Sequence, residues 1–473
     1  SKIPVVRQEI GEQKTLSPAS LPAEIKPAVR RRVVLTEVKS LEDCILKAVE
    51  QYRPLVIAQE QEKLAMLRVR EARRSFYPAL LLEWKETKGE TVTEPYRGRS
   101  YGLQSEQQLF TGGKLTATLR KEQLGQIIAQ GNLDKIKQEF IFNISKAYYE
   151  LVLARNVVDQ MKRLRKTEKD LLTQVEQETK IGSATIAELL NAQSVYNQAI
   201  FQVASAEQEF AQAKLRLEKE MFIEDLDVAQ LDYRFSRRRF DADLETCLDL
   251  ALRSRAEIRI IEKTIEQADF GEDIIRSERM PNVSVVGSWG QSGEAFQQRD
   301  LNLGQEWSVM GKVRWFFGGN TVESSYKHDR VSPYYVTKTD TKAQADELGA
   351  KMSFWDNLAH FTKAKEAYIT KQQAEKDLDE MRNKIRQEIE ESYYAFKKFS
   401  AQLSLAINEI GYRRKQLEII KIKRQMAEAG AVEEMDAELQ LVQANNNLQQ
   451  ALAGMNIAVV SLNRAVGISN YFN

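Results

Sequence analysis

The sequence is poor in the residues that interrupt helices. Its 473 residues include only 22 glycines and 9 prolines, and its charges nearly cancel, with 69 Lys and Arg against 68 Asp and Glu. A chain without a net basic charge has no field that would favour nucleic acid as a partner. Few helix breakers, together with a mean hydropathy of −0.47, indicate long and solvated helices.

Metal-ligating and nucleophilic side chains are equally scarce. The chain has two histidines, His328 and His360, and two cysteines, Cys44 and Cys247. Neither pair has the short spacing of a zinc site or of a redox pair. We therefore expect no metal and no cofactor, and we expect both cysteines to pack in apolar cores.

Long apolar runs are also missing. No stretch reaches the roughly 18 residues that a membrane-spanning helix requires, and the uncharged stretch 439–463 is so rich in Gln and Asn that a packed helix is expected. The first residues lack the apolar core of a signal peptide, which leaves either a numbering that begins after cleavage or a protein that is not secreted. The prolines near the start predict an extended arm over 1–39, and 468–473 is a short C-terminal tail.

The chain contains an internal repeat. Five features recur in the same order, at offsets that rise from 203 to 248 residues: Cys44 and Cys247, Pro78 and Pro281, Gly112-Gly113 and Gly318-Gly319, Tyr148-Tyr149 and Tyr393-Tyr394, Gly182 and Gly430. The largest jump falls between the paired glycines and the paired tyrosines. It predicts an insertion of about 39 residues after Gly319 in the second copy.

Each copy is expected to contain a helix, a strand pair, a long helix, a tight tip and a return helix. Repeat 1, 40–222, has its strands at about 79–110, its long helix at 114–178, its tip at 181–183 and its return helix at 184–222. Repeat 2, 243–467, has its strands at about 282–317, an insertion at 320–360, its long helix at 361–429, its tip at 429–431 and its return helix at 432–467. A linker, 223–242, joins the copies. The first helices are predicted to run unbroken over 41–76 and 244–279, each ending before a proline.

The long helices have the pattern of a coiled coil. Apolar residues from Leu133 to Met161 repeat every 3.5 residues, the period of a left-handed supercoil. About 64 helical residues would reach roughly 95 Å, which suits a tube or a stalk better than a globular domain. Gly182 and Gly430 are expected to end these helices in the left-handed conformation. Ser183 is the expected N-cap of the first return helix.

The tryptophans lie outside the long helices. Trp84, Trp289, Trp307 and Trp315 fall in segments where apolar residues alternate with polar ones, the signal of a strand. Two interpretations are open, an ordinary sheet core and a belt at a membrane interface. Four strands cannot close a barrel, and open sheet edges are not tolerated in lipid. Several chains would therefore have to share one barrel, and three copies would give twelve strands.

Together these features resemble the TolC-type outer-membrane factor family, the outer membrane efflux proteins. The resemblance covers about 40–467 and rests on these motifs: Leu41-x-x-Cys44-Ile45-x-x-Ala48-Val49, Tyr77-Pro78, Leu109-Phe110-Thr111-Gly112-Gly113, Ala147-Tyr148-Tyr149-x-Leu151 and Gly182-x5-Glu188-Leu189-Leu190-Asn191-Ala192-Gln193. Either Trp315-Phe316-Phe317-Gly318-Gly319 or Met352-Ser353-Phe354-Trp355-Asp356-Asn357 could mark the junction before the second long helix.

The resemblance implies a mainly α fold with a small β part. A long α-helical coiled-coil barrel would carry a four-stranded contribution to a trimeric, 12-stranded transmembrane β-barrel. It implies a place in the outer membrane of a Gram-negative-type bacterium, with most of the chain in the periplasm. As partners it implies a homotrimer, a periplasmic adaptor, an inner-membrane pump and outer-membrane lipid. The chain would be the passive duct of a tripartite efflux or type I secretion system, not an enzyme.

Two groups of residues are candidates for function. The resemblance implies that the tips contact the adaptor, through Ile181, Gly182, Ser183, Ala429, Gly430 and Ala431. It also implies an acidic residue lining the periplasmic entrance, at Glu188 and at Asp436, with Glu433 and Glu434 as competitors in repeat 2. Carboxylates around a threefold axis would favour cations and raise each other's pKa. The alternative is that these acids only complement the helix dipole.

Two other functions compete with a channel. A coiled-coil scaffold of the envelope would explain the long helices but not the strand pairs with their tryptophans. An enzyme would need a nucleophile with its base or a phosphate loop, and neither Gly112-Gly113 nor Gly318-Gly319 is followed by Gly-Lys-Ser/Thr.

Overall fold

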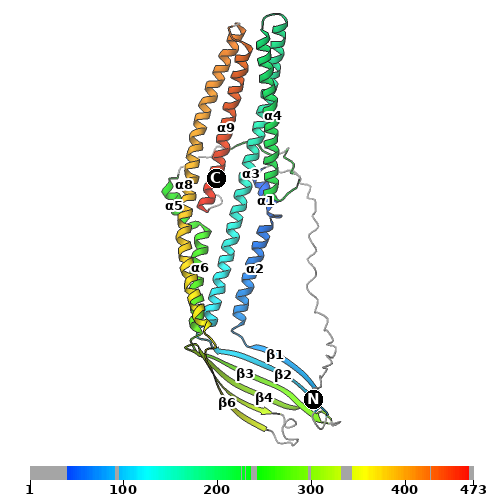
Figure 1. Ribbon diagram of the computed structural model, residues 1–473, viewed down its shortest axis with the longest axis vertical. Helices are drawn as coiled ribbons and strands as arrows, with labels where there is room; N and C mark the ends of the chain where they lie inside the picture. The colour runs from blue at the N-terminus through cyan, green and yellow to red at the C-terminus, as the bar shows by residue number, and fades with distance from the viewer. Residues whose placement is uncertain are drawn as a thin grey trace, which may run out of the picture.

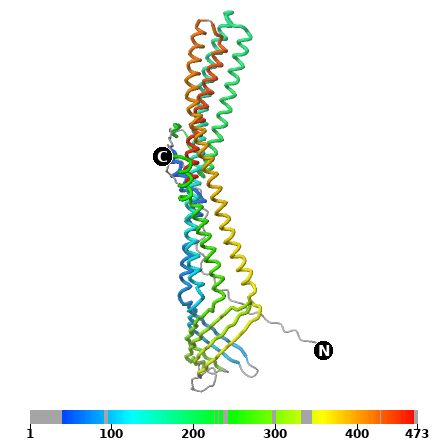
Figure 2. Tube along the Cα trace, turned by 90° about the vertical axis from the view of Figure 1, so that its left-hand side faces the viewer, coloured from blue at the N-terminus to red at the C-terminus, as the bar shows by residue number. Residues whose placement is uncertain are grey.

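The protein is a long rod with a β-sheet at one end and two helical tips at the other (Figure 1). The computed structural model describes residues 40–90, 95–224, 226–228, 231–235, 242–296, 300–331, 343–426 and 428–467. The predicted arm, 1–39, and the predicted tail, 468–473, lie outside the described residues. Both views of the molecule place the strands at the same end, far from the helix reversals (Figures 1 and 2).

The two repeats are built from helices of matching length. Repeat 1 contains α1 (Leu41–Val49), α2 (Arg53–Arg74), β1 (Ala79–Glu90), β2 (Pro95–Phe110), α3 (Lys114–Lys180) and α4 (Ile186–Met221). Repeat 2 contains α5 (Leu244–Ser254), α6 (Ala256–Ser277), β3 (Asn282–Phe296), β4 (Gly304–Phe317), β5 (Asn320–Val331), β6 (Ala343–Ser353), α8 (Ala359–Gln425) and α9 (Ala431–Val466). The long helices α3 and α8 both have 67 residues, and the return helices α4 and α9 both have 36. At ~1.5 Å per residue the long helices each reach roughly 100 Å.

The first helix of each repeat, predicted to be unbroken, consists of two helices. Tyr52 and Arg255 have extended backbone, with ψ of 94° and 128°, and each is the N-cap of the longer helix that follows. In repeat 1 the break coincides with Pro54, which suits the first turn of a helix but not its interior. In repeat 2 no proline is present, and the break instead buries the Arg255 side chain beside the partly buried carboxylates of Glu257 and Glu388.

The helices form a wall that is four helices wide both near the sheet and near the tips. Near the sheet the packing order across the wall is α2, α3, α6 and α8, and near the tips it is α4, α3, α9 and α8. The long helices run the whole length, while the shorter ones share the remaining places (Figure 1). At mid-length the Tyr52 ring at the start of α2 packs against Phe222, which follows the end of α4, at 5.4 Å between centroids.

Two apolar clusters occupy this middle level. One joins α1 to α3 and α4 around Cys44, Phe140 and Leu217. The other joins α5 to α8 and α9 around Cys247 and Ile389. Both cysteines are buried and free, as predicted, and burial raises the pKa of the Cys44 thiol to about 12. These thiols therefore serve packing and not redox chemistry.

The sheet has six strands in the described part of the chain, not the predicted four. The strands follow the order β1 to β6, each antiparallel to the next. The predicted insertion forms β5 and β6, which continue the sheet beyond β4, so Gly318-Gly319 is a turn between strands. The chain enters α8 through 354–358, and the Met352–Asn357 motif therefore marks the junction. The four-strand count was wrong because the insertion, read as a separate segment, alternates weakly in hydropathy.

Candidate functional site

The sheet has one apolar and one polar face. Partners in the ladder lie on the same face, and the register aligns Leu103 with Trp289 and Trp289 with Trp307. The apolar face carries Leu80, Leu82, Trp84, Tyr101, Leu103, Val285, Trp289, Trp307, Val309, Val313, Trp315, Tyr326, Leu348 and Met352, and toward the end away from the helices it also carries Gln291, His328, Arg330 and Asp346. The polar face carries Glu83, Lys85, Gln104, Glu106, Ser288, Glu306, Ser308, Lys312, Arg314, Glu323, Lys327, Asp329, Glu347 and Lys351, together with the apolar Leu81, Val286, Met310 and Phe316.

The apolar face lies at the surface of the chain. Leu82 is 80% exposed, Leu348 is 78% exposed and Trp84 is 65% exposed. A sheet in water would bury this face, whereas lipid solvates it and leaves the polar face for an aqueous lumen. All four predicted tryptophans share the apolar face. Trp315 lies at its helical end, where its indole Nε1 donates to the Arg279 carbonyl oxygen at 3.0 Å.

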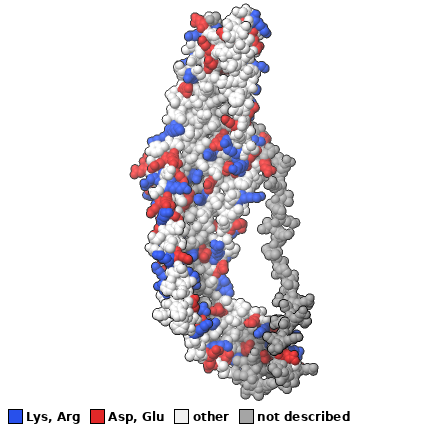
Figure 3. Space-filling model, in the orientation of Figure 1, with Lys and Arg blue, Asp and Glu red and all other residues white. Residues whose placement is uncertain are grey.

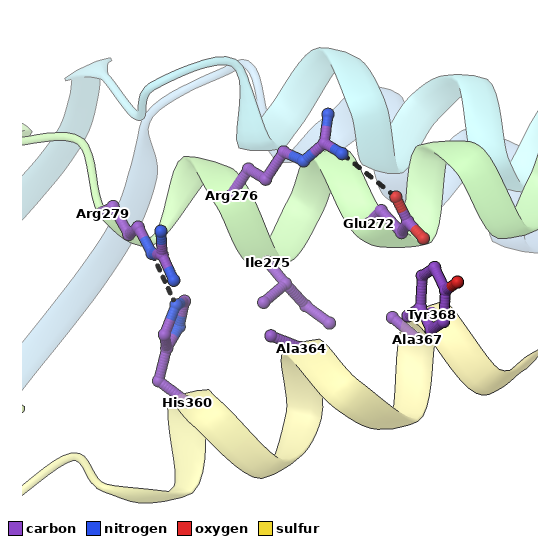
Figure 4. Close-up of a pocket in the computed structure, with 8 residues that line it drawn as sticks. All are labelled: Glu272, Ile275, Arg276, Arg279, His360, Ala364, Ala367 and Tyr368. Atoms are coloured by element: carbon purple, nitrogen blue, oxygen red, sulfur yellow. Dashed lines mark hydrogen bonds and ion pairs between the residues drawn. The ribbon is translucent and has the colours of Figure 1, made fainter.

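A buried histidine holds the helices to the sheet. His360, in the first turn of α8, is 1% exposed and faces α6 across a shallow pocket (Figure 4). Arg279 Nε donates to its Nε2 at 3.1 Å, and its Nδ1 lies 3.3 Å from a Glu278 carboxylate oxygen. The ring also packs on Phe316 of β4, at 4.8 Å between centroids. These contacts explain a structural role for His360, and among the described residues no cluster of three or more metal-ligating side chains occurs.

The two tips differ in conformation. Gly182 has φ of +80°, as predicted, and its amide donates to the Thr179 carbonyl. Gly430 does not: its φ is −82° and ψ 161°, and it is the N-cap of α9. Since α4 and α9 begin 245 residues apart, the counterpart of Gly430 is Thr185 and not Gly182. The prediction paired the two glycines because each follows a long helix in sequence.

Thr185, not Ser183, is the N-cap of the first return helix. Its hydroxyl accepts from the Glu188 amide at 3.2 Å, and the Glu188 carboxylate accepts from the Thr185 amide at 2.7 Å, which completes a capping box. The hydrogen bond from the Thr185 backbone amide, followed by the one that the Thr185 hydroxyl donates to the carboxylate at 3.0 Å, lowers the pKa of Glu188. Glu188 is exposed and remains ionised, so its role in the cap and a role at an entrance are compatible.

The other predicted entrance acids are in different surroundings. Glu433, which lies 245 residues after Glu188, and Asp436 are exposed on the first turns of α9. Glu434 is 8% exposed, and its carboxylate accepts from Arg424 Nη1 at 2.7 Å. Arg424 also contacts Glu178 of α3 at 3.3 Å, so it joins the two hairpins. Glu434 is thus part of this buried ion pair, while Glu188, Glu433 and Asp436 lie at the surface.

One polar residue between the hairpins escaped sequence reasoning. Glu168 of α3 is 1% exposed, and neither of its carboxylate oxygens has a hydrogen-bond partner. Burial, followed by the charges of Glu438, Asp436 and Glu434 on α9, raises its pKa to about 8. The sequence signal that could have identified Glu168 is its position in the apolar seam of α3. Leu164, Glu168, Leu171 and Val175 follow helical spacing, and all four are buried.

Charged side chains are unevenly spread along the rod. In the view of Figure 3 they crowd its middle and thin out over the hairpins between the middle and the tips. No helix among the described residues is both long and apolar enough to cross a bilayer.

The comparisons with known proteins agree with this architecture. Residues 45–221 match the family described as outer membrane efflux protein. No curated protein matches the sequence. Similar solved structures include the CmeC outer membrane channel of Campylobacter jejuni, at 15% identity and TM-score 0.71, covering 90% of this chain and 85% of CmeC. The outer membrane protein VceC of Vibrio cholerae has 14% identity and TM-score 0.70, covering 91% of this chain and 96% of VceC.

A third similar structure is the MtrE outer membrane channel of Neisseria gonorrhoeae, in an open state. It has 16% identity and TM-score 0.69, covering 91% of this chain and 89% of MtrE. These likenesses establish the fold over almost the whole chain, and the family match falls on repeat 1. With its duplicated hairpins and surface-exposed apolar sheet face, the chain has the fold of these outer-membrane channels, and its first repeat matches the outer membrane efflux protein family.

Proposed function

We propose that three copies of the chain stand side by side and form a passive export duct. The observation that carries this proposal is the sheet, which exposes an apolar face and leaves both edge strands, β1 and β6, without a partner strand among the described residues. In lipid, unpaired backbone groups at such edges cost several kcal/mol each. The cost disappears when the open sheet edges of neighbouring copies pair with one another.

The edges of the helical wall also expose apolar side chains. On one edge Phe201 of α4 is 72% exposed and Ile57 of α2 is 58% exposed. On the other edge Leu405 and Tyr412 of α8 are 67% and 62% exposed. Contact between the edges of neighbouring copies would remove these residues from water. The wall would thereby close into a tube along its whole length.

The number of copies can be measured by native mass spectrometry of the detergent-solubilised protein. Three protomers are expected in the released complex. A stable detergent-solubilised monomer that retains its full sheet content would contradict the proposal.

The alternative function, a coiled-coil scaffold, makes a different prediction about location. A scaffold would not need an exposed apolar face on its sheet, and it would remain soluble when the cells are fractionated. The proposed duct should instead sediment with the outer membrane and run as a detergent-resistant oligomer.

The tips are the proposed contact with a periplasmic adaptor, which links the duct to an inner-membrane pump. They lie about 100 Å from the sheet and expose apolar side chains, including Ile181 at 77%, Ile186 at 71% and Met426 at 64%. Exposed apolar groups at the end of a rod are typical of a protein-binding surface.

Gly182→Val is expected to weaken adaptor binding about 10-fold. A β-branched residue is strained at φ of +80° by roughly 1–2 kcal/mol, so the tip would leave its native conformation in most molecules. A photo-crosslinking side chain at position 181 would measure adaptor capture in living cells, with trimer yield as a check on folding.

Two variants control this experiment. Gly182→Asn should keep most of the capture, because Asn tolerates the left-handed region. Gly430→Val should also keep it, since the φ of Gly430 is −82°. Equal losses in Gly182→Val and Gly430→Val would refute the conformational argument.

Replacing Glu188, Glu433 and Asp436 together with Ala is expected to lower the cation selectivity of the duct. If these exposed acids line the narrow periplasmic end, three copies would place nine carboxylates around the axis and would also bind multivalent cations. Planar-bilayer recordings would show a reversal potential closer to zero and weaker block by trivalent cations. The difference should fade at about 1 M salt, where the screening length falls to ~3 Å.

A matched variant removes the same charge elsewhere. Asp377, Asp379 and Glu380 are exposed on α8, well away from the tips. Their replacement by Ala should leave selectivity and block near the wild-type values. Unchanged selectivity in the tip variant would place its three acids outside the duct.

A further inference from the structure

The second repeat carries an extra strand pair at a definable point. Gly112 and Gly113 follow β2 with φ of +62° and +91°, and α3 begins at the next residue. Gly318 and Gly319 have nearly the same conformation, with φ of +56° and +88°, but the chain continues into β5. In repeat 1 this turn leads directly into the long helix α3. In repeat 2 the 39 residues from 320 to 358 lie between the equivalent turn and the long helix α8.

The start of α8 lies beside that turn. The Asn357 amide donates to the Gly319 carbonyl at 3.4 Å, and the Leu358 side chain lies against Gly319. The strand pair thus leaves and returns to one place, and it extends the sheet without displacing the helix. Nearest the helices its side chains keep the division of the sheet: Leu348 and Met352 lie on the apolar face, and Glu347 and Lys351 lie on the polar face. Farther from the helices, His328 and Asp346 lie on the apolar face and pair with each other.

We propose that β6 of one copy pairs with β1 of the next, so that three copies close a barrel of eighteen strands. This inference rests on the proposed trimer. Each open edge of the sheet then pairs with a neighbouring copy of this chain. Both edge strands are long, with 12 residues in β1 and 11 in β6, and neither contains an internal proline or a bulge that would protect an open edge.

The widths of sheet and wall support the larger barrel. Six strands spaced about 4.8 Å apart and tilted by about 40° occupy roughly 38 Å of circumference. Four helices packed about 9 Å apart occupy roughly 36 Å. Four strands would occupy only about 25 Å. With six strands the barrel meets the helical tube at nearly equal width.

The extra strand pair widens the barrel and so affects the size of the molecules that can pass through it. Eighteen strands enclose a backbone diameter of about 36 Å, and twelve enclose about 24 Å. Side chains on the inner face remove about 10 Å, half of it on each side, which leaves roughly 26 Å and 14 Å. The outer opening would then be no narrower than the helical tube, and the barrel would impose no size limit of its own on what is exported.

Cysteine pairs test the closure directly. Lys351 on β6 and Leu81, Glu83 and Lys85 on β1 lie on the polar face, and partners across a ladder share a face. Lys351→Cys combined with a cysteine at one of these three β1 positions should give disulfide-linked dimers and trimers on oxidation. The pairing with Leu82→Cys, on the opposite face, should not. The two native cysteines are buried and do not compete.

A different cross-link would overturn the inference. If β5 and β6 lie outside the barrel, β4 must face the neighbouring β1, and Arg314→Cys with Leu81→Cys should link the protomers instead. Trimers with that link would leave the proposed function intact and remove the eighteen-strand barrel. The absence of trimers would remove the proposed function itself.

Deletion of residues 320–358 gives a second readout. It joins Gly319 to Ala359 as Gly113 joins Lys114 in repeat 1. The deletion should leave a trimer with a twelve-stranded barrel and reduce single-channel conductance about twofold, because the narrower barrel stands in series with an unchanged tube. Trimers with unchanged conductance would contradict the inference, and the cysteine pairs decide the matter if the deletion does not fold.

Discussion

Arg255→Ala is expected to accelerate hydrogen exchange at the start of α6 about 100-fold. Arg255 is 5% exposed, and its guanidinium contacts the carboxylates of Glu257 and Glu388. Burial alone would raise the pKa of Glu257, but the hydrogen bonds and charge of Arg255 hold it below its usual value. Removal of the cation leaves two partly buried carboxylates unpaired, which costs about 3 kcal/mol in local opening.

The measurement is deuterium uptake of peptides from α5, α6 and the end of α9 in the assembled protein. Arg253→Ala is the matched control, because Arg253 is 75% exposed and pairs with Asp249 at the surface. Such a surface pair contributes ~0.5 kcal/mol or less. The argument fails if the two variants exchange at the same rate. The Arg255 variant should also recover part of its protection at acid pH, where Glu257 is protonated.

Glu168→Gln is expected to abolish a pH dependence in the stability of the tip hairpins. The folded pKa of Glu168 is about 8, above the ordinary value of 4.5, because the native state holds its proton in a buried site. The contribution of Glu168 protonation to the free energy of unfolding is therefore fully present below about pH 4.5, and it is lost as pH rises through about 8. The shift corresponds to at most about 5 kcal/mol per protomer.

Hydrogen exchange of peptides from α3 and α9, corrected for the intrinsic rate and recorded from pH 6 to 9, would reveal this effect. Wild-type protection should fall with rising pH, while the Gln variant should stay level and exceed the wild type at pH 9. Asp170→Asn, an exposed acid on the same helix, should follow the wild type. A wild-type profile without slope would show that Glu168 is ionised in the folded protein.

Much of the candidate site followed from local pattern. The reversal at Gly182 was placed correctly because a glycine that ends a long periodic segment marks a change of backbone direction. The shared face of the four tryptophans follows from strand alternation combined with the register. The place of Glu188 six residues after the glycine was also readable, but its hydrogen bonds to Thr185 were not.

Other parts of the site depended on what lies across an interface. Tyr52 and Arg255 occupy equivalent positions before α2 and α6, yet one packs in an aromatic cluster and the other joins two carboxylates. The sequence shows neither set of partners. Similarly, nothing local distinguishes Glu434, which Arg424 holds in a buried pair, from its exposed neighbour Glu433.

The sequence by itself determined the duplicated order of elements, the long helices and the two-faced strands, because periods of 2 and 3.5 residues are local properties that survive without a partner. Only the tertiary structure decided that 320–353 adds two strands to the sheet, that Thr185 and Gly430 are counterparts, and that Glu168 is buried against α9. Each of these depends on register or packing between segments far apart in the chain. Such contacts are set by the shapes and charges that meet there, and not by the pattern of either segment alone.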